Sequence, residues 1–255
     1  MTTQSRSHFI WHELMTDDVP GALAFYGHVL GLTAEKFPSA DGGDYHVLSA
    51  GGRGMGGAMP LRDGMTKAFW VGYLATGDVD AEAARLEKAG GKVMRPAADI
   101  PHVGRFALVT DPQGAGFVLF NPTPPPGGAP PAATGRGAVG WCELLTSDAA
   151  AAFDFYAEQY GWEKGFAVDM GPMGTYQIFA TGGNPAGGMM TKMPQSPQPF
   201  WLFYFNVDGI DAATERIKEA GGQVVNGPVE VPGGQWIVQA VDPQGGMFAL
   251  VAPGH

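Results

Sequence analysis

The chain has 255 residues, of which 45% are hydrophobic and 16% are charged, so it can bury a substantial core and is not intrinsically disordered. Its formal net charge of −10 at pH 7 disfavours binding to the phosphates of nucleic acids and docking on anionic membranes. The single cysteine, Cys142, excludes an intrachain disulfide.

The first elements are predicted by hydrophobic periodicity and by capping residues. Residues 9–15 alternate and are rich in apolar side chains, which indicates a strand. Asp18 is a good helix N-cap, Pro20 suits the first turn, and Gly31 is a good C-cap. We therefore expect a helix that runs to Leu30.

The same criteria predict the rest of the first half. A second helix is expected over residues 80–89, and the turn Asp111-Pro112-Gln113-Gly114 should join the last two strands into a hairpin. The expected strands cover residues 45–49, 56–59, 68–75, 92–95, 105–110 and 116–121.

The strongest signal in the sequence is an internal repeat. It includes a Trp-x-Glu-Leu strand, a Phe-Tyr pair in the first helix, a Phe-Trp pair and an Asp-Pro-Gln-Gly turn. The matched segments, offset by 130 and, after one inserted residue, by 131, are 11–14 with 141–144, 25–26 with 155–156, 69–70 with 200–201, and 111–114 with 242–245. We predict two domains, residues 1–121 and 138–255.

Residues 122–137 lie between the two copies and are rich in proline and glycine. Repeated proline prevents regular ladders and favours an extended polyproline conformation. We interpret this segment as a semi-stiff linker.

The repeated Phe-Tyr pairs and the two Asp-Pro-Gln-Gly turns resemble those of the vicinal oxygen chelate superfamily, which includes glyoxalases, bleomycin-resistance proteins and extradiol dioxygenases. The resemblance covers nearly the whole chain outside the linker. It implies an α+β fold in which each domain duplicates a βαβββ module. The two modules form a cupped, mixed sheet of eight strands with helices on the convex face and the ligand on the concave face. It says little about function, because this fold hosts many unrelated chemistries.

Metal-using members of that superfamily place His, Gln or Glu ligands on the first, fourth, fifth and last strands. Alignment puts apolar residues at these positions here: Trp11 and Trp141, Val71 and Leu202, Val118 and Ala249, and segments 57–59 and 188–190. None of these side chains is a hard-metal ligand. We therefore expect no cofactor and no metal in the family's usual arrangement, while a divalent metal at a different site that uses His12, His46 or His102 stays open.

Glu13 and Glu143 occupy the repeated Trp-x-Glu-Leu strand. Residues two apart on a strand share a face, so each carboxylate should lie beside Trp11 or Trp141. One interpretation is a catalytic general base or a ligand-anchoring carboxylate in each cup. The other is a structural glutamate, bonded to backbone or to an arginine, that the duplication copied.

Aromatic side chains are expected to line the cups and to bind substrate. One face of the strands is expected to carry Trp11, Tyr73, Trp141 and Tyr204, and the opposite face Trp70 and Trp201. Such a lining suits a flat or apolar ligand. We interpret Trp70 and Trp201 as core residues.

The histidines and Arg105 are weaker candidates. His12 should point away from Glu13 into the core, and its repeat counterpart, Cys142, is interpreted as a small apolar core residue. A site in the first half alone, combining His46 or His102 with Glu13, stays open. Arg105 either binds an anionic substrate, pairs with Glu13 or lies at the surface.

These features lead to two functional hypotheses. The first is a glyoxalase-like lyase or isomerase that acts on a small carbonyl or aromatic metabolite, with Glu13 and Glu143 as proton-transfer bases. The alternative is a bleomycin-resistance-type protein that sequesters an aromatic small molecule. We expect a small-molecule partner and no nucleic acid or membrane. We expect a monomer or a homodimer. A cytoplasmic location is expected because the N-terminus does not resemble a secretory signal.

Overall fold

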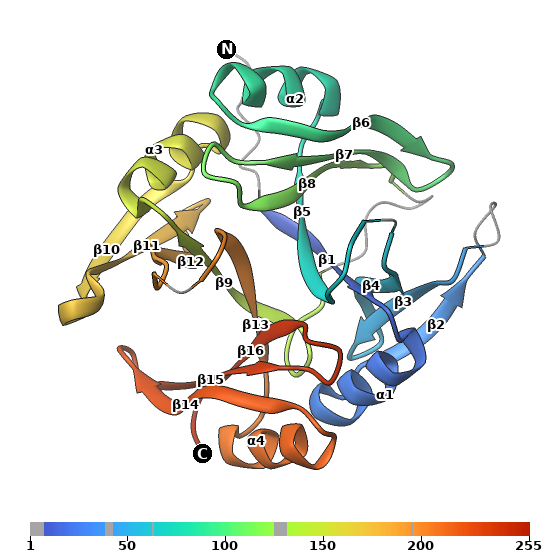
Figure 1. Cartoon of the computed structure of the whole chain (residues 1–255), viewed down its shortest axis with the longest axis vertical. Coiled ribbons are helices and arrows are strands. Elements are labelled where there is room, and N and C mark those ends of the chain that lie inside the picture. Colours follow the sequence, from blue (N-terminus) through green and yellow to red (C-terminus); the bar gives the residue numbers. More distant parts are fainter. Residues whose placement is uncertain (1–7, 39–42, 63, 125–131, 195) are drawn as a thin grey trace. The chain divides into compact units, whose positions relative to one another are not determined.

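The structure is a computed structural model that describes residues 8–38, 43–62, 64–124, 132–194 and 196–255. In these residues the sequence repeat forms two mixed sheets of eight strands, one from each half (Figure 1). The first half contains β1 (Phe9–Thr16), α1 (Val19–Leu30), β2 (Thr33–Phe37), β3 (Tyr45–Ala50), β4 (Arg53–Pro60), β5 (Phe69–Ala75), α2 (Val79–Lys88), β6 (Lys92–Ile100), β7 (Gly104–Thr110) and β8 (Gly116–Pro122). The second half contains β9 (Val139–Thr146), α3 (Ala149–Tyr160), β10 (Glu163–Asp169), a short 3-10 turn (Gly171–Met173), β11 (Thr175–Thr181), β12 (Asn184–Thr191), β13 (Phe200–Asn206), α4 (Ile210–Glu219), β14 (Gln223–Val231), β15 (Gln235–Val241) and β16 (Met247–Ala252).

The two sheets have the same strand order, which confirms the predicted α+β class and the duplicated βαβββ module. The first sheet runs β2-β3-β4-β1-β5-β8-β7-β6, and the second runs β10-β11-β12-β9-β13-β16-β15-β14. β1 pairs with β4 and β5 with β8 in parallel, and the second half repeats both pairings. The remaining strands of each module form antiparallel hairpins, including the predicted β7–β8 hairpin.

The first helix has the caps that the sequence predicted, and its counterpart in the second half has equivalent ones. The side chain of Asp18 accepts a hydrogen bond from the backbone of Gly21 at 3.0 Å, and Gly31 ends α1 with a φ of 75°. Asp148 and Gly161 cap α3 in the same way. The glycines are suited to these positions because they adopt the left-handed conformation without a steric penalty.

Two edge strands were not predicted from the sequence. β2 pairs with β3, and β10 pairs with β11. All five side chains of β2 are exposed, so its sequence shows no apolar alternation. Its conformation is set by the ladder with β3, which a local pattern does not reveal.

Close contacts group the chain into two compact units, and each unit combines segments from both halves. One unit comprises Trp11–Val71, Pro130–Trp141 and Leu202–His255, and the other comprises the remaining segments. The domain boundaries expected from the repeat, at residues 121 and 138, therefore remain a prediction.

Each unit contains a buried tyrosine whose hydroxyl forms hydrogen bonds with distant segments of the same unit. In the unit containing α1, Tyr26 donates a hydrogen bond to Asp242 Oδ2 at 2.7 Å and accepts one from Trp70 Nε1 at 2.9 Å. Asp242 uses its other oxygen to accept the backbone N–H of Gln244 and Gly246, which closes its own turn.

The other unit contains an equivalent network. Tyr156 donates to Asp111 Oδ2 at 3.2 Å and accepts from Trp201 Nε1 at 3.2 Å. Trp70 and Trp201 are 6% and 4% exposed, which places both in the core, as the sequence indicated.

The end of the predicted linker is tied to β13. Gly137 donates its backbone N–H to Asn206, and Asn206 donates to Ala138, at 2.8 and 2.9 Å. Residues 125–131 of the linker lie outside the described residues. Among the helices that the structure describes, none combines the length and hydrophobicity needed to cross a bilayer.

Candidate functional site

Glu13 and Trp11 project from the same side of β1, and β3 and β4 complete their surroundings. Glu13 is paired with Gly57 of β4, and Val47 of β3 faces Gly57 on its other side. Tyr45, two residues before Val47, lies on this side as well. We call the surface formed by Trp11, Glu13, Phe37, Tyr45 and Gly57 the Glu13 face.

The carboxylate of Glu13 is buried within a polar network of aromatic residues. Its residue is only 7% exposed. The indole Nε1 of Trp11 donates a 3.0 Å hydrogen bond to the Tyr45 hydroxyl. Burial, followed by the charge of Glu13 and a hydrogen bond with Glu13, raises the pKa of Tyr45, so its hydroxyl keeps its proton.

Phe37 extends the aromatic lining towards solvent. It pairs directly with Tyr45 across β2 and β3, so the two side chains share a face. Their ring centroids are 6.3 Å apart in an edge-to-face arrangement, and Phe37 is 40% exposed. The Glu13 face therefore grades from an exposed aromatic ring to a buried carboxylate.

The second half repeats the key parts of this arrangement. Glu143 is 5% exposed and is paired with Gly188 of β12. The ring of Tyr176, from β11, lies directly over Gly188, as Tyr45 lies over Gly57. Trp141 precedes Glu143 by two residues and therefore shares its side of β9.

Sequence reasoning missed Tyr45 and Tyr176. A signal was present, because Tyr45 matches Tyr176 and Gly57 matches Gly188 at the offset of 131 found elsewhere in the repeat. Their relation to the glutamates depends on strand pairing between distant segments, which local periodicity does not predict.

The other predicted binding residues have different surroundings. Tyr73 is 8% exposed and meets Phe120 edge to face at 5.5 Å. Tyr204 is 4% exposed, and its hydroxyl accepts a 2.8 Å hydrogen bond from Gln239. These two residues remain predicted binding residues, outside the network of Trp11, Tyr45 and Glu13.

Arg105 lies in a surface ion-pair cluster. Its guanidinium binds Asp80 at 2.7 Å and Asp99 at 2.9 Å, and its side chain is 35% exposed. The hydrogen bonds to Asp80 and Asp99 raise the pKa of Arg105, so these carboxylates stabilise its positive charge. Since two carboxylates already occupy its donors, the structure adds no support for its predicted role in substrate binding.

The histidines take separate positions. His12 is 7% exposed and packs against Phe203 with ring centroids 4.8 Å apart, as expected of a core residue. His46 bonds to Asp44 at 3.1 Å and pairs with Ala58, so it alternates with Tyr45 and faces away from the Glu13 face. His102 is exposed in the β6–β7 turn, with a φ of 64°.

The positions that would carry the superfamily's metal ligands do not suit a metal ion. Val118 pairs with Tyr73 and Ala249 with Tyr204, and neither side chain has a donor atom. At the first-strand position, Trp11 uses its indole N–H to bind Tyr45. In the described ranges, no cluster of three or more His, Cys, Asp or Glu side chains could hold a metal.

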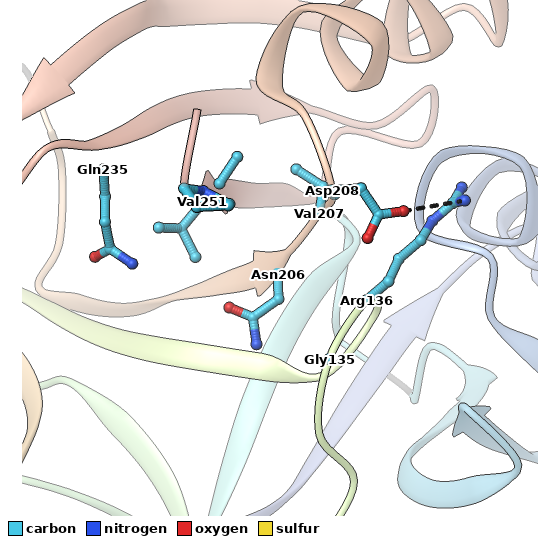
Figure 2. Close-up of a pocket in the computed structure, with 9 residues that line it drawn as sticks. Gly135, Arg136, Asn206, Val207, Asp208, Gln235 and Val251 are labelled. Atoms are coloured by element: carbon cyan, nitrogen blue, oxygen red, sulfur yellow. Dashed lines mark ion pairs between the residues drawn. The ribbon is translucent and has the colours of Figure 1, made fainter. Parts of the chain in front are cut away.

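A separate hollow of about 300 Å³ lies where the end of the linker meets β13, β15 and β16 (Figure 2). Its only ion pair between lining residues in Figure 2 is Arg136 with Asp208, at 3.9 Å, with both side chains exposed to solvent. Such an exposed pair contributes little stabilisation. Its lining residues are Gly135, Arg136, Asn206, Val207, Asp208, Gln235, Val251, Ala252 and Pro253. It lacks the buried carboxylate that distinguishes the Glu13 face.

Comparison with protein families gives one match that covers both halves. The model of the Glyoxalase/Bleomycin resistance protein/Dioxygenase superfamily matches residues 7–119 and again residues 138–250. Residues 120–137, which lie between the two matches, include the whole Pro- and Gly-rich segment.

Two full-length relatives share about a third of the sequence. "Putative glyoxylase CFP32" of Mycobacterium tuberculosis is 32% identical over 248 residues, covering 95% of this chain and 94% of the relative. "Anthracycline biosynthesis protein DnrV" of Streptomyces peucetius is 32% identical over 258 residues, covering 94% of this chain and 91% of the relative.

Solved structures with the same fold are more distant in sequence. The 2,3-dioxygenase LapB from Pseudomonas sp. KL28 superposes with a TM-score of 0.68 at 13% identity, covering 99% of this chain and 94% of its own. The Mn(II)-bound glyoxalase from Novosphingobium aromaticivorans superposes with a TM-score of 0.68 at 17% identity, covering 96% of this chain and 81% of its own. At these identities the likeness establishes the fold alone.

Proposed function

The chain belongs to the glyoxalase/bleomycin resistance protein/dioxygenase superfamily, and from this premise we propose that it is a glyoxalase-like enzyme with lyase or isomerase activity. Its substrate is a small carbonyl or aromatic metabolite that binds at the Glu13 face. Glu13 transfers the proton, and Glu143 has the same role in the second half. This chemistry does not use the superfamily's usual metal positions, where the chain has no His, Gln or Glu.

The observation that carries the proposal is a buried glutamate beside aromatic side chains in both halves. Glu13 is 7% exposed and Glu143 is 5% exposed. Burying a carboxylate is unfavourable unless hydrogen bonds satisfy it. A carboxylate that is nevertheless buried in an aromatic setting is a candidate for catalysis.

A carboxylate in this position can act as a general base. It accepts the proton of a C–H group next to a carbonyl, while the electron pair of that bond moves towards the carbonyl oxygen and forms an enolate. Return of the same proton to another carbon gives an isomer. Departure of a leaving group from the enolate gives the product of a lyase.

The aromatic lining favours a planar ligand. Trp11 and Tyr45 present rings near Glu13, and Phe37 continues this lining beside Tyr45. Such rings bind flat or apolar molecules by stacking and edge contacts. The similarity to a relative named for anthracycline biosynthesis supports an aromatic polycyclic ligand.

The alternative function is binding without turnover. The same aromatic lining would suit a protein that sequesters an aromatic small molecule, with Glu13 accepting a hydrogen bond from a ligand hydroxyl. The family match includes bleomycin-resistance proteins, which supports this second candidate.

The two functions are separated by replacing each glutamate with glutamine. The chain would be incubated with aromatic ketones that carry a C–H group next to the carbonyl, such as 2-tetralone, with products and hydrogen–deuterium exchange followed by mass spectrometry. Binding of these ketones and of 1,4-dihydroxyanthraquinone would be measured by calorimetry. We expect the double variant Glu13→Gln, Glu143→Gln to lose at least about 100-fold in turnover, the usual contribution of a general base. Its melting temperature should stay close to that of the wild type.

Each outcome points to one function. Unchanged turnover in the folded double variant would contradict the proposed role of the glutamates. Tight binding of an unaltered ligand would favour sequestration. The two single variants show whether one or both halves are active.

A further inference from the structure

The hydrogen-bond roles of Trp11 and Tyr45 leave one proton to be placed. An indole N–H can only donate, so at 3.0 Å the Tyr45 hydroxyl oxygen must accept from Trp11. The hydrogen of the Tyr45 hydroxyl is therefore directed to another acceptor. A carboxylate, which has about four lone-pair positions, can accept this hydrogen and still bind a ligand donor.

The strand register places Glu13 at that position. Gly57 is the residue of β4 opposite Glu13, and the Tyr45 side chain lies directly over Gly57. A methyl group added to Gly57 would overlap the Tyr45 hydroxyl and ring. Only glycine at residue 57 allows the phenol to reach across β4 towards Glu13.

We propose that Tyr45 is a positioning residue for Glu13. Its hydroxyl accepts from Trp11 and donates to the Glu13 carboxylate, which fixes the orientation of the carboxylate and favours its ionised form. Gly57 is required because it leaves the space that the phenol occupies. The consequence for catalysis rests on the proposed function, but the hydrogen-bond relay itself does not.

The second half contains the same device. Tyr176 covers Gly188, whose partner on β9 is Glu143, and a methyl group at Gly188 would overlap the Tyr176 ring. The residues that follow the two tyrosines differ, His46 against Gln177 for example, whereas the tyrosine and the glycine are retained in both halves. The retained pair indicates that the tyrosine and glycine act together.

The physical consequence is a change in the protonation of Glu13 when the hydroxyl is removed. A hydrogen bond to the charged form of a carboxylate lowers its pKa, so loss of the donor should raise it. In Tyr45→Phe we expect the midpoint of Glu13 ionisation to rise by about one pH unit, a tenfold change in the proton-binding constant.

The relay can be tested by NMR on the ligand-free full-length chain. The titration of the Glu13 carboxyl carbon reports its ionisation, and the Trp11 indole N–H resonance reports its hydrogen bond. In Tyr45→Phe we expect the Glu13 midpoint to rise and the Trp11 resonance to move, while the Glu143 midpoint stays unchanged. Tyr176→Phe should have the reciprocal effect on Glu143.

The role of the glycine is tested by Gly57→Ala. This variant keeps Tyr45 but fills its space, so it should reproduce both changes. Gly116→Ala is a matched control on β8, because its added methyl would meet only the Val109 carbonyl at 4.0 Å. We expect this control to leave both signals unchanged.

The result that would overturn the proposal is a folded Tyr45→Phe protein in which the Glu13 midpoint and the Trp11 resonance are those of the wild type. This variant decides the question even if Gly57→Ala does not fold. The readout uses no ligand, so absence of turnover on every compound would contradict the proposed function without affecting this test. If turnover is found, the acidic limb of its pH–rate profile should shift in Tyr45→Phe by the same amount as the Glu13 midpoint.

Discussion

The hydroxyl of Tyr26 donates a 2.7 Å hydrogen bond to Asp242, a residue 216 positions further along the chain. Tyr26 belongs to the Phe-Tyr pair of the first half, and Asp242 begins the Asp-Pro-Gln-Gly turn of the second. Tyr156 and Asp111 form the reciprocal bond in the other unit. The two motifs that mark the repeat therefore bind each other, each across the two halves of the sequence.

Removing either tyrosine hydroxyl should destabilise the chain. Tyr26→Phe removes the donor to Oδ2 of the buried Asp242 carboxylate and the acceptor of the Trp70 indole N–H. A buried hydrogen bond to a charged group contributes about 2 kcal/mol, so we expect a loss of this size in the free energy of unfolding. Tyr156→Phe should have a similar effect, measured by urea unfolding at pH 7.

Tyr160→Phe provides a matched control. The hydroxyl of Tyr160 is also buried, but it makes no hydrogen bond with any residue in the described ranges. Removing a polar atom that has no partner is close to neutral or stabilising. Equal destabilisation by Tyr26→Phe and Tyr160→Phe would show that lost packing, rather than the bond to Asp242, causes the effect.

The glutamine of the Asp-Pro-Gln-Gly turn should matter in one copy more than in the other. Gln113 accepts from Thr146 and from the backbone of Asp148 at 2.9 and 2.6 Å, and it donates to the Asp148 carbonyl at 2.7 Å. The equivalent Gln244 has a buried side-chain oxygen with no partner among the described residues.

We therefore expect Gln113→Ala to lower the free energy of unfolding by about 2 kcal/mol and Gln244→Ala by less than about 1 kcal/mol. Thermal unfolding of the two variants side by side measures the difference. A larger loss in Gln244→Ala would contradict the assignment of these hydrogen bonds.

The repeat and the capping residues predicted the fold because they are local or periodic signals. The Asp18 cap, the Gly31 cap and the hairpin turn at residues 111–114 each act over a few residues of sequence. β2 was missed because its five side chains are exposed, and exposed strands carry no apolar alternation. Its structure comes from hydrogen bonds with a neighbouring strand.

The candidate site was predicted only in part for a related reason. Alternation along a single strand placed Glu13 beside Trp11 and away from His12. Tyr45 enters the site through the pairing of β3, β4 and β1, which joins residues more than thirty positions apart in sequence. Local patterns left the role of Arg105 open, because its ion pairs with Asp80 and Asp99 depend on contacts that periodicity does not predict.

The chain is expected to purify without a stoichiometric metal. Tryptophan, valine and alanine at the superfamily's ligand positions offer no lone pair suited to a divalent ion. Elemental analysis after dialysis should find far less than one equivalent of metal per chain, and a chelator should leave the melting temperature unchanged. One equivalent of Fe, Ni, Mn or Zn that survives dialysis would contradict this expectation.

His12 should make stability depend on pH in the mildly acidic range. Burial lowers the pKa of His12 from its ordinary value of 6.5 to about 4, opposed in part by a hydrogen bond with the Met55 backbone. Between these values the unfolded chain binds a proton that the folded chain does not. The stabilisation is therefore complete above about pH 6.5 and is lost as the pH falls towards 4. The full stabilisation is about 3 kcal/mol, because each pKa unit corresponds to roughly 1.4 kcal/mol.

The variant His12→Cys isolates this contribution, because Cys142 is the residue at the same position of the second half. Burial raises the pKa of Cys142 to about 12, so a cysteine at residue 12 should stay neutral throughout the range. Burial also raises the pKa of Asp111 and Asp242, with the opposite effect on stability, but both proteins share these groups. We expect the unfolding free energy to fall more steeply in the wild type than in His12→Cys between pH 6.5 and 4.5. Parallel curves would show that His12 is protonated as readily in the folded chain as in the unfolded one.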